Sequence, residues 1–457
     1  MQRPPIFWLY RDHLRDLVTR TSRAMETAGV DRVVVHSGTA LRKTQFDDQF
    51  WSLRPTPHFQ HWIPLREPGC LLLLSPGKKP KLVWPMIENY WERTRTPEFE
   101  SYFALFDLVR PTTEAKVKSV VRSFVGSTRA AFVGDDLEAA SQLGFGKSVM
   151  NPSKLLAALD ALRVHKSEYE VACLQEANVI AARGHAAVKR AFAKASKTEL
   201  DLHLLYLQAT AQDDPETPYK NIVALGENGA TLHHIDYKKE TDESDHTLLL
   251  DAGATYRGYC SDITRTWVKE GANGKQTGSR AARSVFAGLV EGVENLQRAL
   301  CESVIIGKRY EELHEESHRR VSQLLVETGV ISKLSSEAVD VSGISRLFYP
   351  HGLGHSLGLQ CHDVGCALRR PKKENPYLRN TSTIEAGQAF TIEPGIYFIE
   401  SLMTKLRTHK YRANINHRLI EELRPFGGIR IEDDIVVRTN GITNLTRDLL
   451  PLGGGIV

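Results

Sequence analysis

The sequence has no apolar run that approaches the ~20 residues of a membrane-spanning helix. Its first residues carry no long apolar segment of the kind found in secretion signals. Cysteine is also scarce: the 457 residues include six, and no two of them form a C-x-x-C pair. This scarcity argues against a disulfide framework and favours a reducing compartment. We therefore expect a cytoplasmic protein that does not bind membranes.

An excess of charge of one sign is missing as well. The chain has 59 lysine and arginine residues against 55 aspartate and glutamate residues, so its formal net charge is only +4. This balance lacks the basic excess of a nucleic-acid-binding protein, and we expect no nucleic-acid partner. Apolar residues make up 41% and charged residues 25%, which is the composition of a folded globular protein.

The patterns that are present indicate two domains. A chain of 457 residues exceeds the ~250–300 at which a single core stops growing. Short apolar runs alternate with helical patterns over residues 1–155 and predict an α/β domain with a mixed or parallel sheet. Residues 156–457 form the second predicted domain, which begins with a helix that Ser167 and Glu170 cap at capping-box spacing. We expect the terminal glycines 453–455 to be flexible.

Strands and helices are predicted from the local patterns. The predicted strands lie at or near residues 33–35, 71–74, 81–84, 130–134, 248–268, 389–399 and 429–438. The predicted helices lie near residues 11–29, 153–194, 276–300 and 309–329.

Two aspartates lie on the predicted hairpin near residues 248–268. An apolar run leads into Asp251, and Asp262 is carried by the returning strand. The two strands of a hairpin can place these carboxylates side by side, where they repel each other unless a cation lies between them. Each residue also has an explanation without a metal, as an aspartate at a strand end or in a turn.

Three histidines, His351, His355 and His362, fall within twelve residues and are separated by glycines. Glycine lets the backbone approach a site closely, and imidazole suits Zn, Mn, Fe or Co. The alternative is a glycine-rich loop whose histidines are simply packed or exposed.

Two glutamates lie inside apolar strands. Glu393 and Glu432 each need a partner, because a buried unpaired carboxylate is costly. Strand alternation places Arg430 on the same face as Glu432, so an ion pair between them is one explanation, but it leaves Glu393 without a partner.

Together, Asp251, Asp262, His355, Glu393 and Glu432 form a set that can hold two divalent ions, with two carboxylates shared between them. Two ions ~3.5–4 Å apart can share one water, lower its pKa and make a hydroxide nucleophile at neutral pH. The same ions polarise the carbonyl group under attack.

The order of these motifs resembles that of the pita-bread metallopeptidases, and within them the bacterial Xaa-Pro dipeptidases, or prolidases, whose branch includes organophosphorus acid anhydrolase. The resemblance covers most of the chain. Residues 162–170 are similar to the start of the family's catalytic domain, and residues 46–48, 55–62 and 425–432 are similar to the prolidase branch. The resemblance implies an α/β (α+β) fold: an N-terminal mixed-sheet α/β domain that serves in dimerisation and substrate-length control, followed by a pita-bread (creatinase/aminopeptidase-like) domain.

The same resemblance implies roles for the five ligands. Asp251 looks like the chelating ligand of one metal, and Asp262 and Glu432 look like the bridging carboxylates. His355 and Glu393 look like ligands of the second metal, and Glu393 is also similar to the family's proton shuttle. The implied cofactor is a pair of divalent ions, with Mn²⁺ favoured by the carboxylate-rich set and Co²⁺ or Zn²⁺ as substitutes.

Further residues match positions around the metals. His351 and His362, assigned to catalysis, and His233 and Arg430, assigned to substrate binding, match positions that bind the proline carboxylate and steady the tetrahedral intermediate. Tyr219 matches a pocket-lining position. By the same resemblance, Asp47 or Asp48, together with Trp91, reaches the site of a neighbouring subunit in a homodimer and limits the substrate to a dipeptide.

The expected activity is the release of proline from Xaa-Pro dipeptides, with side hydrolysis of organophosphate triesters implied by the resemblance. One alternative is an Xaa-Pro aminopeptidase, similar to aminopeptidase P, which acts on longer peptides with the same five ligands. Another is a pita-bread binding module without catalysis, but such modules lose metal ligands that this chain keeps.

Several features depart from the family or point elsewhere. The chain has Cys361 and Cys366 where the family often has an aliphatic residue and a glycine, and His233-His234 where it often has His-Tyr. His314 and His318 match the H-E-x-x-H zinc motif, but the charged segment around them favours a solvated helix face.

Overall fold

The computed structural model describes residues 6–457 except 89, 92–99, 243–244 and 271–279. Contacts between residues divide the chain into two compact units, Met1–Ala172 and Cys173–Val457. The division falls inside helix α7 (Glu168–Lys194), whereas the predicted boundary near residue 155 falls one helix earlier, in α6. Both units combine helices with mixed or antiparallel sheets, as predicted.

The N-terminal unit is built on a mixed five-stranded sheet with the order β4-β3-β2-β1-β5. Its strands are β1 (Arg32–His36), β2 (Leu71–Leu74), β3 (Lys81–Val83), β4 (Asp107–Val109) and β5 (Ala130–Val133). Its helices are α1 (Ile6–Ala28), α2 (Pro57–Gln60), α3 (Glu100–Phe103), α4 (Glu114–Val125), α5 (Leu137–Gln142) and α6 (Ser153–Val164). The central strand β1 runs antiparallel to β2 and parallel to β5, and its Val34 faces Leu73 and Phe132 in the core.

The C-terminal unit contains two principal sheets. The first has the order β16-β10-β7-β6 and the second has the order β11-β14-β15. Their strands are β6 (Ile222–Leu225), β7 (Thr247–Asp251), β10 (Thr264–Val268), β11 (Ala389–Ile392), β14 (Asp433–Arg438), β15 (Gly441–Asn444) and β16 (Gly454–Ile456). This unit also has two short antiparallel strand pairs. They are β8 (Thr255–Tyr256) with β9 (Tyr259–Cys260) and β12 (Gly395–Tyr397) with β13 (Gly428–Arg430).

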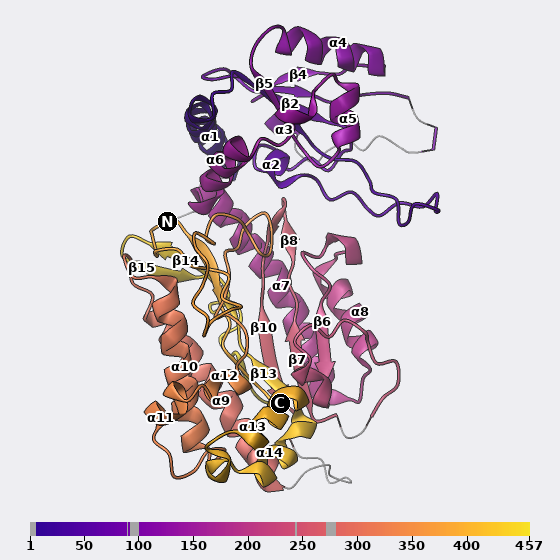
Figure 1. The fold of residues 1–457 in the computed structure, drawn as a ribbon. Coiled ribbons are helices and arrows are strands. Elements are labelled where there is room, and N and C mark those ends of the chain that lie inside the picture. Colours follow the sequence, from indigo (N-terminus) through magenta and orange to yellow (C-terminus); the bar gives the residue numbers. More distant parts are fainter. Residues whose placement is uncertain (1–5, 89, 92–99, 243–244, 271–279) are drawn as a thin grey trace. The chain divides into compact units, whose positions relative to one another are not determined.

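Helices cover these sheets in two groups (Figure 1). Apolar side chains of α7 and α8 (Glu199–Thr210) form one core with β6, β7 and β10. A larger core joins the second sheet to the later helices. Those helices are α9 (Arg280–Glu302), α10 (Tyr310–Glu327), α11 (Ser336–Val341), α12 (Ser345–Phe348), α13 (Glu400–Thr408) and α14 (His417–Leu423).

Two predictions about local structure meet opposite outcomes. The capping box is confirmed, because the Ser167 backbone N–H donates to Glu170 Oε2 over 2.8 Å. The prediction of a flexible glycine tail is wrong: residues 454–456 form β16, which pairs in parallel with β10. Glycine is needed there, since a Cβ at Gly454 would overlap the carbonyl oxygen of Thr266. Within the described residues, no helix has the length and apolar character to cross a bilayer.

Candidate metal centre

The two aspartates lie side by side at the ends of β7 and β10. These strands pair antiparallel, with Asp251 at the end of β7 facing Thr264 at the start of β10, and Asp262 comes two residues before β10. Both side chains are buried. The hydroxyl of Tyr219 lies 2.7 Å from Asp251 Oδ1 and 2.5 Å from Asp262 Oδ1, so one phenol joins both carboxylates. The predicted hairpin geometry is therefore confirmed.

The two glutamates come from the second sheet, where β11 pairs antiparallel with β14. Glu393 directly follows β11 and Glu432 directly precedes β14. An isolated bridge joins Glu432 to Thr264 of the first sheet, and Thr264 Oγ1 donates to Glu432 Oε2 over 2.6 Å. The two sheets thus meet at the point where they carry their carboxylates.

A loop after α12 carries His355 between these carboxylates. Its Nε2 atom lies 3.4 Å from Asp262 Oδ2 and 3.6 Å from Glu393 Oε1, and the ring is buried. The backbone N–H of His355 donates to Thr391 Oγ1, which ties the loop to β11. Gly354 allows this approach, because a Cβ there would overlap the carbonyl oxygen of Thr391.

The electrostatics of the centre show an excess of negative charge. Burial raises the pKa of Asp251, with a further contribution from Asp262. Burial also raises the pKa of Glu393 to about 7 and that of Glu432 well above its ordinary value, the latter with help from Asp262 and Glu393. Burial alone would raise the pKa of Asp262, but hydrogen bonding to His355 lowers it. Conversely, hydrogen bonding to Asp262 raises the pKa of His355 to about 9 against the effect of burial.

This donor set fits divalent cations. Asp262, His355 and Glu432 offer ligand atoms that all lie within 4.8 Å of one another, and all three residues are buried. Arg430 and the imidazole of His355 offset only part of the carboxylate charge. Buried charges of like sign at such distances require compensation, and carboxylate oxygens with an imidazole nitrogen are the ligands that hydrolytic metal sites use.

Five of the residues predicted for catalysis or substrate binding line the cavity that opens onto this centre. The cavity has a volume of about 1020 Å³, and Tyr219, His233, His351, His362 and Arg430 all contribute to its wall. Such a volume is sufficient for a small organic ligand. The structure therefore brings these five residues to the same space as the five proposed ligands.

Arg430 does not pair with Glu432, the partner considered from the sequence. Its Nη2 atom donates to Asp251 Oδ2 over 2.6 Å, and its Nη1 atom donates to the hydroxyl of Tyr397 over 2.9 Å. The same hydroxyl lies 2.9 Å from His351 Nε2. The explanation of Glu432 as an ion-pair partner of Arg430 therefore fails, because the guanidinium pairs with Asp251.

The remaining predicted site residues lie in the N-terminal unit. Asp47 is partly exposed, and Trp91 is 80% exposed. In the part of the chain that the structure describes, neither contributes to the wall of the cavity. Their assignment to a neighbouring subunit's site stays a prediction.

The prediction of a solvated face for the H-E-x-x-H segment is wrong. His314 and His318 on α10 are both buried, and both line the same cavity. The ring of His318 lies 4.9 Å from that of Tyr349, which in turn lies 4.9 Å from that of His351. The charged neighbours in sequence lie on other faces of α10, so charge density along the sequence did not indicate which face is buried.

Sequence reasoning also missed two residues that position the centre. Thr264 holds Glu432, and Tyr397 links Arg430 to His351. Tyr397 ends the motif that begins at Phe390, but it lies on β12 and Glu393 follows β11, so strand alternation did not relate the two residues.

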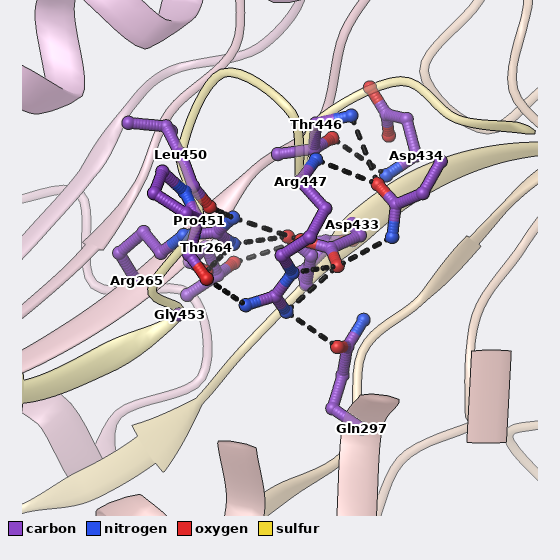
Figure 2. Close-up of polar contacts among 12 residues, drawn as sticks. Thr264, Arg265, Gln297, Asp433, Asp434, Thr446, Arg447, Leu450, Pro451 and Gly453 are labelled. Carbon is purple, nitrogen blue, oxygen red and sulfur yellow. Dashed lines mark hydrogen bonds and ion pairs between the residues drawn. The ribbon is translucent and has the colours of Figure 1, made fainter. Parts of the chain in front are cut away.

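A buried ion network surrounds Asp433, the residue that follows Glu432 (Figure 2). Arg265 pairs with Asp433 over 2.9 Å, with neither side chain exposed, and Arg447 pairs with Asp433 over 2.8 Å. Arg265 also donates to the backbone carbonyl of Glu432 over 2.8 Å. The network therefore holds the backbone of a proposed ligand in place.

The fold and the donor set are typical of one class of protein, the hydrolytic metalloenzymes, with a carboxylate-rich set of candidate ligands where two sheets meet. A family model described as "Metallopeptidase family M24" matches residues 172–439, and one described as "Xaa-Pro dipeptidase, N-terminal domain" matches residues 8–161. The chain belongs to metallopeptidase family M24. Membership in this family implies divalent metal ions, which agrees with the donor set.

Three relatives are similar over nearly their full length. Each is described as "Xaa-Pro dipeptidase", and the matches cover 96% of this chain and 98% of each relative. The relative from Pseudoalteromonas atlantica is 37% identical, that from Proteus mirabilis 35% and that from Escherichia coli strain SE11 36%. The predicted resemblance to the prolidase branch and the prediction of a hydrolase are confirmed.

Solved structures share the fold. Proline aminopeptidase P II from Yersinia pestis matches with a TM-score of 0.70 at 23% identity, covering 96% of both chains. The aminopeptidase PepP of Pseudomonas aeruginosa matches with a TM-score of 0.72 at 22% identity, covering 98% of this chain and 96% of that one. The predicted fold class, an N-terminal α/β domain followed by a pita-bread domain, is confirmed.

Proposed function

We propose that the chain is a dinuclear metal-dependent Xaa-Pro dipeptidase that releases proline. One observation carries the proposal: four carboxylates at the strand ends of two sheets and one histidine on a loop converge at a cavity of about 1020 Å³. The description of the full-length relatives as Xaa-Pro dipeptidases supports the choice of substrate.

The cofactor of this proposal is two divalent ions per chain. Asp251 would hold one ion, His355 and Glu393 would hold the other, and Asp262 and Glu432 would bridge them. When bound, such ions lower the pKa of a water and polarise a carbonyl oxygen. Mn²⁺ is the favoured ion because oxygen donors dominate the set, and Co²⁺ or Zn²⁺ can substitute.

The protein's own side chains position the dipeptide and move its protons. Arg430 presents a planar guanidinium to the cavity, which suits recognition of a carboxylate such as the free C-terminus of proline. His233 and His362 line the same space as donors to substrate oxygens, and His351 beside them is bonded to Gly352 O and to the hydroxyl of Tyr397. Glu393 lies 3.7 Å from His351 Nδ1 at the wall of the cavity and passes a proton to the proline nitrogen as the peptide bond breaks.

The test is proline release from Ala-Pro by the purified chain supplied with Mn²⁺, compared with release of alanine from Ala-Pro-Ala. The proposal requires cleavage of the dipeptide and much slower cleavage of the tripeptide. Preference for Ala-Pro-Ala would establish the aminopeptidase alternative instead. Absence of cleavage with Mn²⁺, Co²⁺ and Zn²⁺ would remove the proposed activity.

The proposal also includes a homodimer in the cytoplasm. In this dimer, Asp47 and Trp91 of the N-terminal unit limit the length of the substrate in the partner's site. Its support is a set of exposed aromatic side chains on this unit, since exposed apolar clusters mark contact surfaces. These side chains are Phe46, Trp51, Tyr90 and Trp91. Light scattering measures the dimer, and Trp91→Ala is expected to raise the rate on Ala-Pro-Ala relative to Ala-Pro.

We also propose that the chain hydrolyses organophosphate triesters as a side activity. A cation pair that polarises a carbonyl oxygen also polarises a phosphoryl oxygen. Paraoxon hydrolysis by the Mn²⁺-supplied chain, with Glu393→Gln as the control, measures it.

A further inference from the structure

Cys361 occupies a special position among the six cysteines. The other five are buried, whereas Cys361 is partly exposed and contributes to the wall of the cavity. Its Sγ atom lies 2.8 Å from Asp262 Oδ2, a distance at which the thiol donates a hydrogen bond to one of the proposed bridging carboxylates. This thiol is therefore placed at the metal centre rather than in a core.

The backbone fixes this placement from both sides of Cys361. The N–H of Cys260 on β9 donates to Gly358 O over 2.8 Å, and the N–H of Asp363 donates to Ser356 O over 2.9 Å. The first bond ties the loop to the strand that ends two residues before Asp262, and the second closes the loop on itself around Cys361. A thiol held in this way needs no large movement to bind a cation beside Asp262.

The donor atoms around Asp262 lie close to the spacing of ligands of one cation. Sulfur and oxygen ligands lie about 2.3 and 2.1 Å from a tetrahedral Zn²⁺, so two of them are about 3.6 Å apart. Cys361 Sγ and His355 Nε2 lie 2.8 and 3.4 Å from the same Asp262 oxygen. His355, Cys361 and His362 also form a group whose ligand atoms lie within 4.8 Å of one another, and this group shares His355 with the group of Asp262 and Glu432.

We propose that Cys361 is an additional, sulfur ligand of the metal centre. Compared with an aliphatic residue at this position, it raises the affinity of the centre for Zn²⁺ and Co²⁺ more than its affinity for Mn²⁺. The inference rests on the metal centre of the proposed function. When the cation binds, the S–H bond of Cys361 breaks and the proton leaves to solvent. A bond between the sulfur and the cation then replaces the hydrogen bond to Asp262. Thiolate donors favour softer cations, whereas an aliphatic residue at this position offers no donor.

Cobalt spectroscopy tests the inference. The metal-free chain is titrated with Co²⁺ and compared with Cys361→Val, Cys361→Ser and the control Cys366→Val, a buried cysteine of the same loop. Weak visible bands report Co²⁺ at the centre in any ligand set, and an intense near-ultraviolet charge-transfer band reports a cobalt–sulfur bond. We expect the visible bands in all four proteins, and the charge-transfer band only in the wild type and Cys366→Val.

The outcomes separate this inference from the proposed function. Visible bands without a charge-transfer band in the wild type would overturn the sulfur ligand and leave the metal centre intact. A charge-transfer band that persists in Cys361→Val would also overturn it. Absence of visible bands in the wild type would remove the metal centre itself, and the sulfur ligand with it.

Alkylation provides a second readout that does not depend on activity. Iodoacetamide is expected to label Cys361 in the metal-free chain, as measured by mass spectrometry. Saturating Zn²⁺ is expected to slow this labelling by roughly tenfold or more compared with saturating Mn²⁺, because a thiolate bound to a cation is not free to attack. Equal protection by the two ions would mean that they only shield the thiol, and would contradict the inference.

Discussion

The side chains proposed to bind the cations also make the metal-free centre unfavourable. The pKa values of Asp251, Glu393 and Glu432 are raised because burial and neighbouring carboxylates disfavour their ionised forms. A divalent cation reverses this preference, since it is the largest charge in such a site. Metal binding and folding are therefore coupled at the level of single residues.

This coupling predicts the behaviour of Glu432→Gln. The substitution removes one negative charge, so the metal-free variant should be at least as stable to urea as the metal-free wild type. At a concentration ~100 times its Kd, each Mn²⁺ ion that binds should raise the free energy of unfolding of the wild type by about 2.7 kcal/mol. The variant should gain much less at the same concentration, because it lacks one proposed bridging ligand.

Urea unfolding with and without Mn²⁺ measures both quantities. Glu337→Gln, on the exposed surface of α11, serves as the control and should respond to Mn²⁺ like the wild type. An equal gain in Glu432→Gln and the wild type would count against Glu432 as a ligand.

Acid should destabilise the C-terminal unit through His185, which α7 buries in the core. Burial lowers its pKa to about 3, and Nε2 donates to the carbonyl of Ala252 over 2.9 Å. The unfolded chain takes up this proton near the ordinary value of 6.5, whereas the folded chain does not, so the free energy of unfolding falls as the pH drops below 6.5. Between pH 7 and pH 5 the expected loss from this residue is about 2 kcal/mol.

His185→Gln keeps an N–H donor but cannot be protonated in this range. Its free energy of unfolding, from urea titrations at pH 7, 6 and 5, should fall by about 2 kcal/mol less than that of the wild type. Identical pH slopes for the two proteins would show that His185 does not cause the loss.

At the scale of elements, the loop that carries His355 must lie directly against β11. Gly354→Ala introduces a Cβ that overlaps the carbonyl of Thr391 and the hydroxyl of Tyr310, so the loop has to move away. We expect a loss of about 1–3 kcal/mol in stability and weaker metal binding as His355 shifts. Thermal unfolding and a Mn²⁺ titration measure the two effects.

Gly288→Ala is the matched control for this prediction. Gly288 lies within α9, where a Cβ would meet no atom within 4 Å. Alanine should therefore stabilise the helix by about 0.5–1 kcal/mol and leave metal binding unchanged. If Gly354→Ala behaved like Gly288→Ala, close approach of the loop to β11 would not be what positions His355.

Strands, helices and contacts could be predicted from the sequence where they depend on residues that are close together in the chain. The apolar run before Asp251 ends in a carboxylate, and a buried carboxylate calls for a partner. The closeness of Asp251 to Asp262 on the same hairpin could therefore be predicted from the local pattern. The burial of His314 and His318 did not follow, because it depends on packing against Tyr349, a residue distant in the sequence. Strand β16 was missed because three glycines have little strand propensity, and its pairing with β10 is long-range.

At the scale of the whole molecule, the centre depends on segments that are far apart in the chain. The buried network of Figure 2 joins β10, β14, α9 and the C-terminal segment through Arg265, Asp433, Gln297 and Arg447. No local pattern in the sequence indicated this network, since each of its charges has a partner more than ten residues away. It explains how Glu432 can be held rigidly in a buried position.

Asp433→Asn tests this support. The substitution leaves Arg265 without its buried counter-charge, and breaking such a pair costs about 3–5 kcal/mol. We expect that loss in urea unfolding, together with weaker Mn²⁺ binding, although Asp433 is not a proposed ligand. Asp448→Asn, on the adjoining C-terminal segment, provides a comparison at a neighbouring acidic residue, and equal effects of the two variants would contradict the account.

The number of cations bound per chain tests the central claim most directly. Equilibrium dialysis of the metal-free protein against Mn²⁺, followed by metal analysis, should give two ions per chain for the wild type and at most one for Asp262→Asn. Binding of no ion by the wild type, or of the same number by wild type and variant, would contradict a two-cation centre built on these side chains.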